Sequence, residues 1–152
     1  TGAYATFSDV VDYMAWLGGH FTDSEDRRAR IVAAGEAIHA HEARLTDAML
    51  HGTGNLPGLA ALDGVTIIGG ALNPLREGLV CFALKDRPAA GIVAALNAAG
   101  IRTHTRKADH YSGNILDPLG LDAAVRVSVC HYNTEEEVAR FLAAMRDIAR
   151  AA

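Results

Sequence analysis

Residues 124–138, AVRVSVCHYNTEEEV, carry the clearest structural signal in this sequence. The first half alternates valines with other residues, the period-2 pattern of a β-strand that buries one face. The segment Thr134–Glu137 then has the form of a capping box, in which a threonine and a glutamate three residues later satisfy the free N–H groups of a helix start. A strand that leads through a short turn into an amphipathic helix predicts a sheet with that helix on its apolar face.

Hydrophobic periodicity outside this segment predicts the remaining elements. Residues 52–58 are rich in glycine and proline and are expected to form a connector. The other expected elements are a helix from Thr6 or Ser8 to Leu17, a long helix over 24–51, strands at 65–68 and 79–84, a helix over 87–99, a strand at 101–105, one helical turn within 114–119, a strand at 124–130 and a last helix from 134.

This order of elements favours an α+β fold. We expect a small mixed or antiparallel four-stranded sheet with helices packed on one face, preceded by the long helix. Residues 1–51 form a helical lead-in, and residues 52–152 form the small α+β domain. No repeat or linker separates them, so we expect one compact unit.

Composition excludes several classes of function. Half of the 152 residues are apolar and the net charge is −4, so neither nucleic acid nor an anionic membrane is an expected partner. Cys81 and Cys130 lie in strand-like runs and do not form a disulfide framework, which favours a cytoplasmic location. The chain begins at Thr1 with no initiator Met and no signal-peptide pattern. We therefore expect a fragment of a longer protein.

Histidines suggest a metal site only weakly. His39 and His41 are two residues apart on the long helix and project to nearly opposite sides, so they cannot share an ion. His104, Asp109 and His110 fall close together in a polar loop where metal ligation is conceivable. A loop of this composition is more typical of solvation or of an organic ligand, and we predict no metal.

Arg126 is the candidate functional residue that stands out. It lies in the middle of a valine-rich strand, where an unpaired guanidinium would be costly to bury. One interpretation is an internal salt bridge with an aspartate or glutamate. The other is a two-pronged binding site for a substrate carboxylate. The residues alone leave both interpretations open.

The segment Val125–Val138 resembles the C-terminal signature of the class V aminotransferase superfamily, which includes the cysteine desulfurases. That signature is a strand with arginine, then Tyr-Asn-Thr, then an acidic helix start. Three further segments are similar to parts of the small domain of these pyridoxal-phosphate enzymes of fold type I. They are Ala99-Gly100-Ile101, the strand at Leu79–Phe82, and the long helix followed by Leu56-Pro57-Gly58.

The resemblance implies that Arg126 binds the α-carboxylate of a small amino-acid substrate. His104, His110 and Tyr111 are further candidates for shaping the substrate pocket. Family desulfurases carry a persulfide-forming cysteine in the loop before the arginine strand, and residues 105–112 contain none. The resemblance puts the standard desulfurase chemistry in doubt and leaves the reaction type open among transamination, elimination, racemisation and desulfuration. The enzyme class is then a transferase or a lyase.

The resemblance also implies what this chain lacks. Pyridoxal phosphate is held mainly by a preceding large domain, which is missing here, and the full-length enzyme is expected to be a homodimer. Neither Lys85 nor Lys107 has the surroundings of the family's Schiff-base lysine. Ala3 stands where a phosphate-binding threonine would be. We expect this chain to bind no cofactor and to be inactive alone. The alternative is a free-standing, non-catalytic α+β domain that binds a small molecule or regulates.

Overall fold

The computed structural model describes residues 2–150. The chain divides into two compact units, Thr1–Glu42 and Ala43–Ala152, which are described separately. Helix α2, Arg27–His51, contributes residues to both. Thr1, where the sequence begins without an initiator Met, lies outside the described residues.

The first unit contains helix α1, Gly2–Gly18, and the beginning of α2. Helix α1 ends at Gly18, within the predicted glycine pair. Only glycine fits there, because a Cβ atom would lie 1.7 Å from the carbonyl oxygen of Arg30. Helix α2 begins at Arg27, three residues later than expected. The side chain of Asp26 sets this start, since its carboxylate accepts the Ala29 N–H at 2.8 Å.

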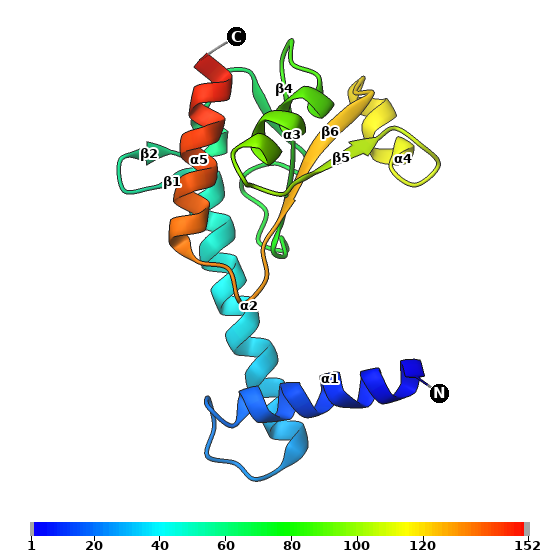
Figure 1. Ribbon diagram of the computed structural model, residues 1–152, viewed down its shortest axis with the longest axis vertical. Helices are drawn as coiled ribbons and strands as arrows, with labels where there is room; N and C mark the ends of the chain where they lie inside the picture. Colours follow the sequence, from blue (N-terminus) through cyan, green and yellow to red (C-terminus); the bar gives the residue numbers. More distant parts are fainter. Residues whose placement is uncertain (1, 151–152) are drawn as a thin grey trace. The chain divides into compact units, whose positions relative to one another are not determined.

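The second unit holds the predicted sheet and the remaining helices (Figure 1). A two-stranded hairpin, β1 with β2, occupies the segment that was expected to be a connector. The elements after α2 are β1 (Gly52–Thr53), β2 (Leu56–Pro57), η1 (Leu59–Ala61), β3 (Val65–Ile67), β4 (Leu79–Leu84), α3 (Ala89–Ala98), β5 (His104–Lys107), α4 (Gly113–Leu116), η2 (Asp117–Leu119), β6 (Ala123–Ser128) and α5 (Glu135–Arg150).

The other four strands form one sheet in the order β3-β4-β6-β5, and every neighbouring pair is antiparallel. This confirms the predicted α+β fold with a four-stranded sheet. Strand β5 begins at His104 rather than at residue 101. The reason is local: the Ile101 N–H donates to the Leu96 carbonyl at 2.9 Å and so belongs to the end of α3.

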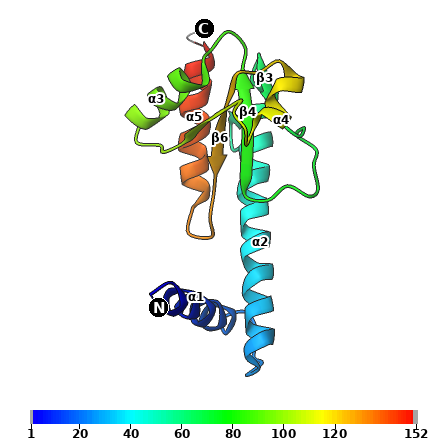
Figure 2. The ribbon, with the colours of Figure 1, turned by 90° about the vertical axis from the view of Figure 1, so that its right-hand side faces the viewer.

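One face of the sheet is covered by helices and forms the core. In Figure 2, α3 and α5 lie to one side of β4 and β6, and α4 lies to the other. The end of α2 adds Leu45 and Met49 to the same core. The rings of Phe82 and Phe141 meet there at 6.5 Å between centroids. The strand residues facing this core are Val80, Phe82, Leu84, Val125 and Val127.

The turn between β6 and α5 is fixed by side-chain hydrogen bonds. The Thr134 hydroxyl accepts the Glu137 N–H at 3.3 Å, and the Glu137 carboxylate accepts the Thr134 N–H at 3.0 Å. This reciprocal pair confirms the predicted capping box. The Asn133 side chain also accepts the Cys130 N–H and donates to Glu137. The strand that carries Arg126 is thereby held to the start of α5.

No helix among residues 2–150 is both long enough and apolar enough to cross a membrane.

Candidate functional site

The second face of the sheet, opposite the helical core, carries Arg126. Val125 and Val127 on either side of it are buried in the core, so strand alternation directs Arg126 to the other face. The strand register sets Arg126 directly between Cys81 of β4 and His104 of β5. We refer to the residues of this side as the open face: Thr66, Cys81, Ala83, His104, Arg106, Ala124, Arg126 and Ser128.

Arg126 is half-buried, and the residues that the structure describes give it no internal partner. Its Nε atom is buried without a hydrogen bond. Within residues 2–150, no aspartate or glutamate forms an ion pair with its guanidinium. A buried N–H that is left unpaired costs about 1–3 kcal/mol, so a site of this kind favours an anion that supplies the missing acceptor.

Positive charge gathers around Cys81. Burial raises the pKa of the Cys81 thiol, and the nearby guanidinium groups of Arg106, Arg126 and Arg76 act in the opposite direction. All three arginines are therefore close enough to Cys81 to affect its ionisation. The open face is electropositive at its centre.

Arg76 shares with Arg126 a buried Nε atom that has no hydrogen-bond partner, but its two terminal nitrogens donate to backbone carbonyls. It donates to the Leu79 carbonyl at 3.1 Å and to the Ile68 carbonyl at 3.2 Å, and also to the Gly70 carbonyl. These bonds tie the loop between β3 and β4 to the strand ends. Arg76 therefore has a structural role, which leaves the Arg126 and Arg106 guanidiniums available to bind a ligand.

The sequence-predicted residues are brought together only in part. His104 is exposed and directly opposite Arg126 in the register. His110 and Tyr111 lie in the loop between β5 and α4, where their rings contact each other at 4.0 Å between centroids. In the described part of the chain, neither ring makes a hydrogen bond or a ring contact with Arg126 or His104.

Asp109 shapes this loop. Its Oδ1 atom accepts the N–H groups of Tyr111 at 2.9 Å and of Ser112 at 3.1 Å. These two hydrogen bonds lower the pKa of the Asp109 carboxyl. The bonds hold Tyr111 outward, with its side chain largely in solvent.

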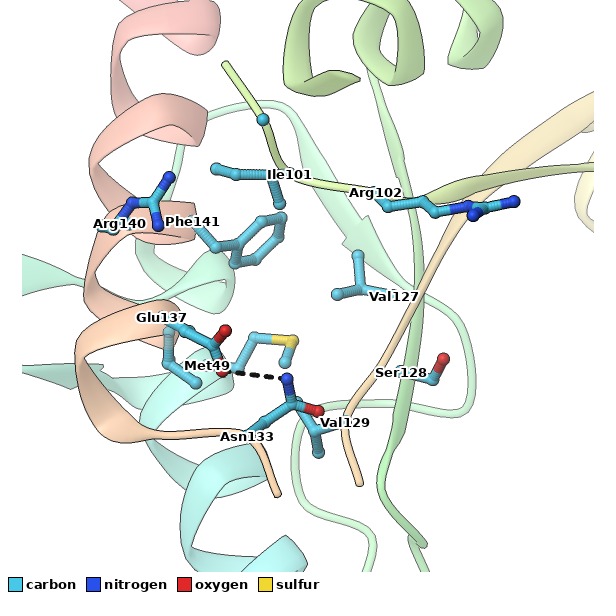
Figure 3. A pocket seen from close by; sticks show the side chains of 12 residues that line it. Met49, Ile101, Arg102, Val127, Ser128, Val129, Asn133, Glu137, Arg140 and Phe141 are labelled. Carbon is cyan, nitrogen blue, oxygen red and sulfur yellow. Dashed lines mark hydrogen bonds between the residues drawn. The ribbon is translucent and has the colours of Figure 1, made fainter. Parts of the chain in front are cut away.

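A cavity of about 280 Å³ lies on the other side of the sheet, between α5, residues 100–102 and the end of β6 (Figure 3). Met49, Ile101 and Phe141 give it an apolar floor, and Arg102 and Arg140 lie at its edge. It does not include Arg126, His104, His110 or Tyr111. Sequence reasoning missed it, since its wall combines three segments that are distant along the chain.

The two lysines differ in their position relative to the open face of the sheet. Lys85 follows the end of β4, directly after the core residue Leu84, so strand alternation does not place it on the core side. Lys107 pairs with Ala123 on β6, and alternation along β5 places it on the side of Thr105, opposite to Arg106. Over residues 2–150, no three His, Cys, Asp or Glu side chains lie close enough together to hold a metal ion.

Comparison with known proteins identifies the family. The family model for "Aminotransferase class-V" matches residues 31–141. A probable cysteine desulfurase 1 of Mycobacterium leprae is 35% identical over 114 residues, which are 75% of this chain and 17% of that protein. A probable cysteine desulfurase of Pseudomonas putida is 30% identical over 136 residues, which are 90% of this chain and 27% of that protein.

Solved structures share the fold. The apo cysteine desulfurase of Thermococcus onnurineus NA1 superposes with a TM-score of 0.62 at 24% identity, over 82% of this chain and 31% of that chain. The chain thus spans less than a third of the length of these relatives. The matched family model covers the four-stranded sheet, α3 and the turn into α5, and the chain belongs to the class-V aminotransferase family.

Proposed function

We propose that this chain is the C-terminal small domain of a pyridoxal-phosphate-dependent enzyme acting on an amino acid, and that Arg126 binds the substrate α-carboxylate. Residues 1–51 are then the end of the large domain and the connecting helix, and residues 52–152 are the small domain. The short share of each relative that this chain spans supports this placement, because most of each relative lies outside the matched part.

The observation that carries the proposal is the unpaired guanidinium of Arg126. Its buried Nε has no hydrogen-bond partner, and the described residues offer it no carboxylate. Arg76, which has a structural role, donates its terminal nitrogens to three backbone carbonyls, whereas no such bond holds Arg126 among the described residues. A substrate carboxylate supplies two acceptor oxygens in the planar geometry that an arginine fork matches.

The residues of this chain fit the substrate side of such a site and not the cofactor side. Neither Lys85 nor Lys107 has the sequence surroundings of the family's Schiff-base lysine, so we assign the lysine that binds the cofactor to the large domain. Pyridoxal phosphate, when bound there, supplies an electron sink for bond breaking at the substrate Cα atom. Arg126 fixes the carboxylate, and the neighbouring His104 contributes to the wall of the pocket. His110 and Tyr111 lie in the loop between β5 and α4, and we assign them a place beside the substrate only if that loop borders the pocket.

The reaction class follows from what the loop lacks. Residues 105–112 of this loop contain no cysteine. Cys81 lies beside Arg126 on the neighbouring strand β4 and not in the loop. The relatives are named cysteine desulfurases, but this chain has no loop thiol to receive sulfur. We therefore favour transamination, elimination or racemisation of an amino acid over desulfuration with a persulfide in this domain.

The test is Arg126→Lys in the full-length, cofactor-loaded homodimer. Lysine keeps the charge and loses the planar fork, and the loss of one charge-assisted bond of roughly 1.5–3 kcal/mol corresponds to about ten- to a hundredfold weaker amino-acid binding. Cofactor affinity should be unchanged. Arg102→Lys, at the edge of the separate cavity, is the matched control. Equal substrate affinity in Arg126→Lys and wild type would contradict the proposal.

A further inference from the structure

We propose that Arg106 forms a second anion-binding group beside Arg126, so that the preferred substrate is an amino acid with an acidic side chain. This inference rests on the proposed function of Arg126 as the α-carboxylate site. It assigns to the same open face a specificity-determining residue that binds the side-chain carboxylate of the substrate.

The strand register brings the two arginines together. Arg126 is directly opposite His104 on β5, and Arg106 is two residues further along the same strand. Residues two positions apart share a face, so Arg106 and Arg126 are diagonal neighbours across β5 and β6. Such diagonal positions are about 7–8 Å apart at the backbone, within reach of each other for long side chains. Figure 1 shows β5 and β6 side by side at this edge of the sheet.

The two guanidiniums act on a common point. The thiol of Cys81, directly opposite Arg126 on β4, is influenced by the charges of both Arg106 and Arg126. The strand register puts Arg106 and Arg126 on the same face as Cys81. Two positive side chains therefore share the open face.

No acidic side chain neutralises this pair in the part of the chain that the structure describes. The charge of Arg106 contributes to lowering the pKa of the Asp109 carboxyl. The Asp109 carboxylate is, however, bound to the N–H groups of Tyr111 and Ser112, and the two side chains form no ion pair. The face thus holds two like charges with an unfilled requirement for negative charge.

A ligand with two carboxylates meets this requirement. In aspartate two carbon atoms separate the carboxyl groups, and in glutamate three, so one carboxylate on Arg126 leaves the other in the direction of a neighbouring group. Asparagine and glutamine have the same shape without the second charge. Discrimination between each acid and its amide therefore isolates the contribution of the second guanidinium.

The experiment is isothermal titration of the full-length, cofactor-loaded enzyme with L-aspartate, L-asparagine, L-glutamate and L-glutamine. Wild type should bind at least one acid about tenfold more tightly than its amide, as one charge-assisted hydrogen bond allows. Arg106→Gln should remove this preference and leave the affinity for the amides unchanged. Lys107→Gln removes the same charge from the adjacent position on the opposite face, and should keep the preference.

Three outcomes would overturn the inference: no preference for either acid in wild type, an unchanged preference in Arg106→Gln, or a preference lost equally in Lys107→Gln. Arg126→Lys separates this inference from the proposed function. If Arg126→Lys weakens acids and amides alike while Arg106→Gln has no effect, Arg126 remains the α-carboxylate site and only the acidic specificity fails. If Arg126→Lys leaves all four ligands unaffected, the proposed function fails.

Discussion

Replacing Arg126 by methionine should leave the isolated 152-residue chain as stable as wild type, or make it slightly more stable. Methionine keeps an unbranched, apolar side chain that can follow the path of the arginine methylenes. It removes the buried Nε atom that has no hydrogen-bond partner. An arginine kept for function commonly lowers the free energy of unfolding, so its replacement commonly raises that free energy.

The magnitude follows from the environment of Arg126. An unsatisfied buried N–H costs about 1–3 kcal/mol, and Arg126 is only half-buried, so the lower end of this range applies. We expect the free energy of unfolding to be unchanged or to rise by about 1 kcal/mol. If Arg126 instead belonged to a buried ion pair, its removal would cost about 3–5 kcal/mol. The two interpretations thus differ in sign and are several kcal/mol apart.

The assay is urea denaturation of the second unit. The single tryptophan, Trp16, belongs to the first unit, so its fluorescence is the wrong signal. Methyl resonances of Val125 or Val127, both in the core beneath Arg126, report the unit that matters. Phe82→Ala provides a sensitivity control, because the fully buried ring should cost about 3–5 kcal/mol. A loss of 3 kcal/mol or more in Arg126→Met would refute the reasoning.

Two further predictions concern Cys81 and the lysines. In a Cys130→Ser background, the rate of alkylation of Cys81 should have a pH midpoint above that of a free thiol, because burial raises the pKa of Cys81. Arg106→Gln should move this midpoint higher, and Lys107→Gln should not. A midpoint at or below that of free cysteine would contradict the burial argument. The 152-residue chain mixed with pyridoxal phosphate and reduced with borohydride should show no stoichiometric mass addition at Lys85 or Lys107, since neither has the sequence surroundings of the family's Schiff-base lysine. Full labelling of either lysine, detected by mass spectrometry, would contradict this.

Most of the sheet could be predicted from the sequence because its strands have a clear period. Strand β4 has the predicted bounds, and β6 and the capping box of α5 lie within a residue or two of theirs. Strand β5 was misplaced because Ile101, although apolar, donates its N–H to the end of α3. The β1–β2 hairpin was missed because strands of two residues contain no period to detect.

The candidate site was accessible to sequence reasoning at one residue. Arg126 was noticeable because a charge in the middle of a valine strand requires an explanation. Arg106 gave no such signal: it is an exposed arginine, and its relation to Arg126 depends on the register between β5 and β6. The cavity at Met49 and Phe141 requires the packing of three segments, which no local pattern encodes.

The most direct test of the central claim is a crystal structure of the full-length enzyme with pyridoxal phosphate and a bound amino acid. The account predicts that the α-carboxylate of the ligand accepts two hydrogen bonds from the Arg126 guanidinium, one of them from the Nε atom that has no partner in the isolated domain. A ligand carboxylate held by other residues, with Arg126 paired to an aspartate or glutamate of the protein, would contradict it.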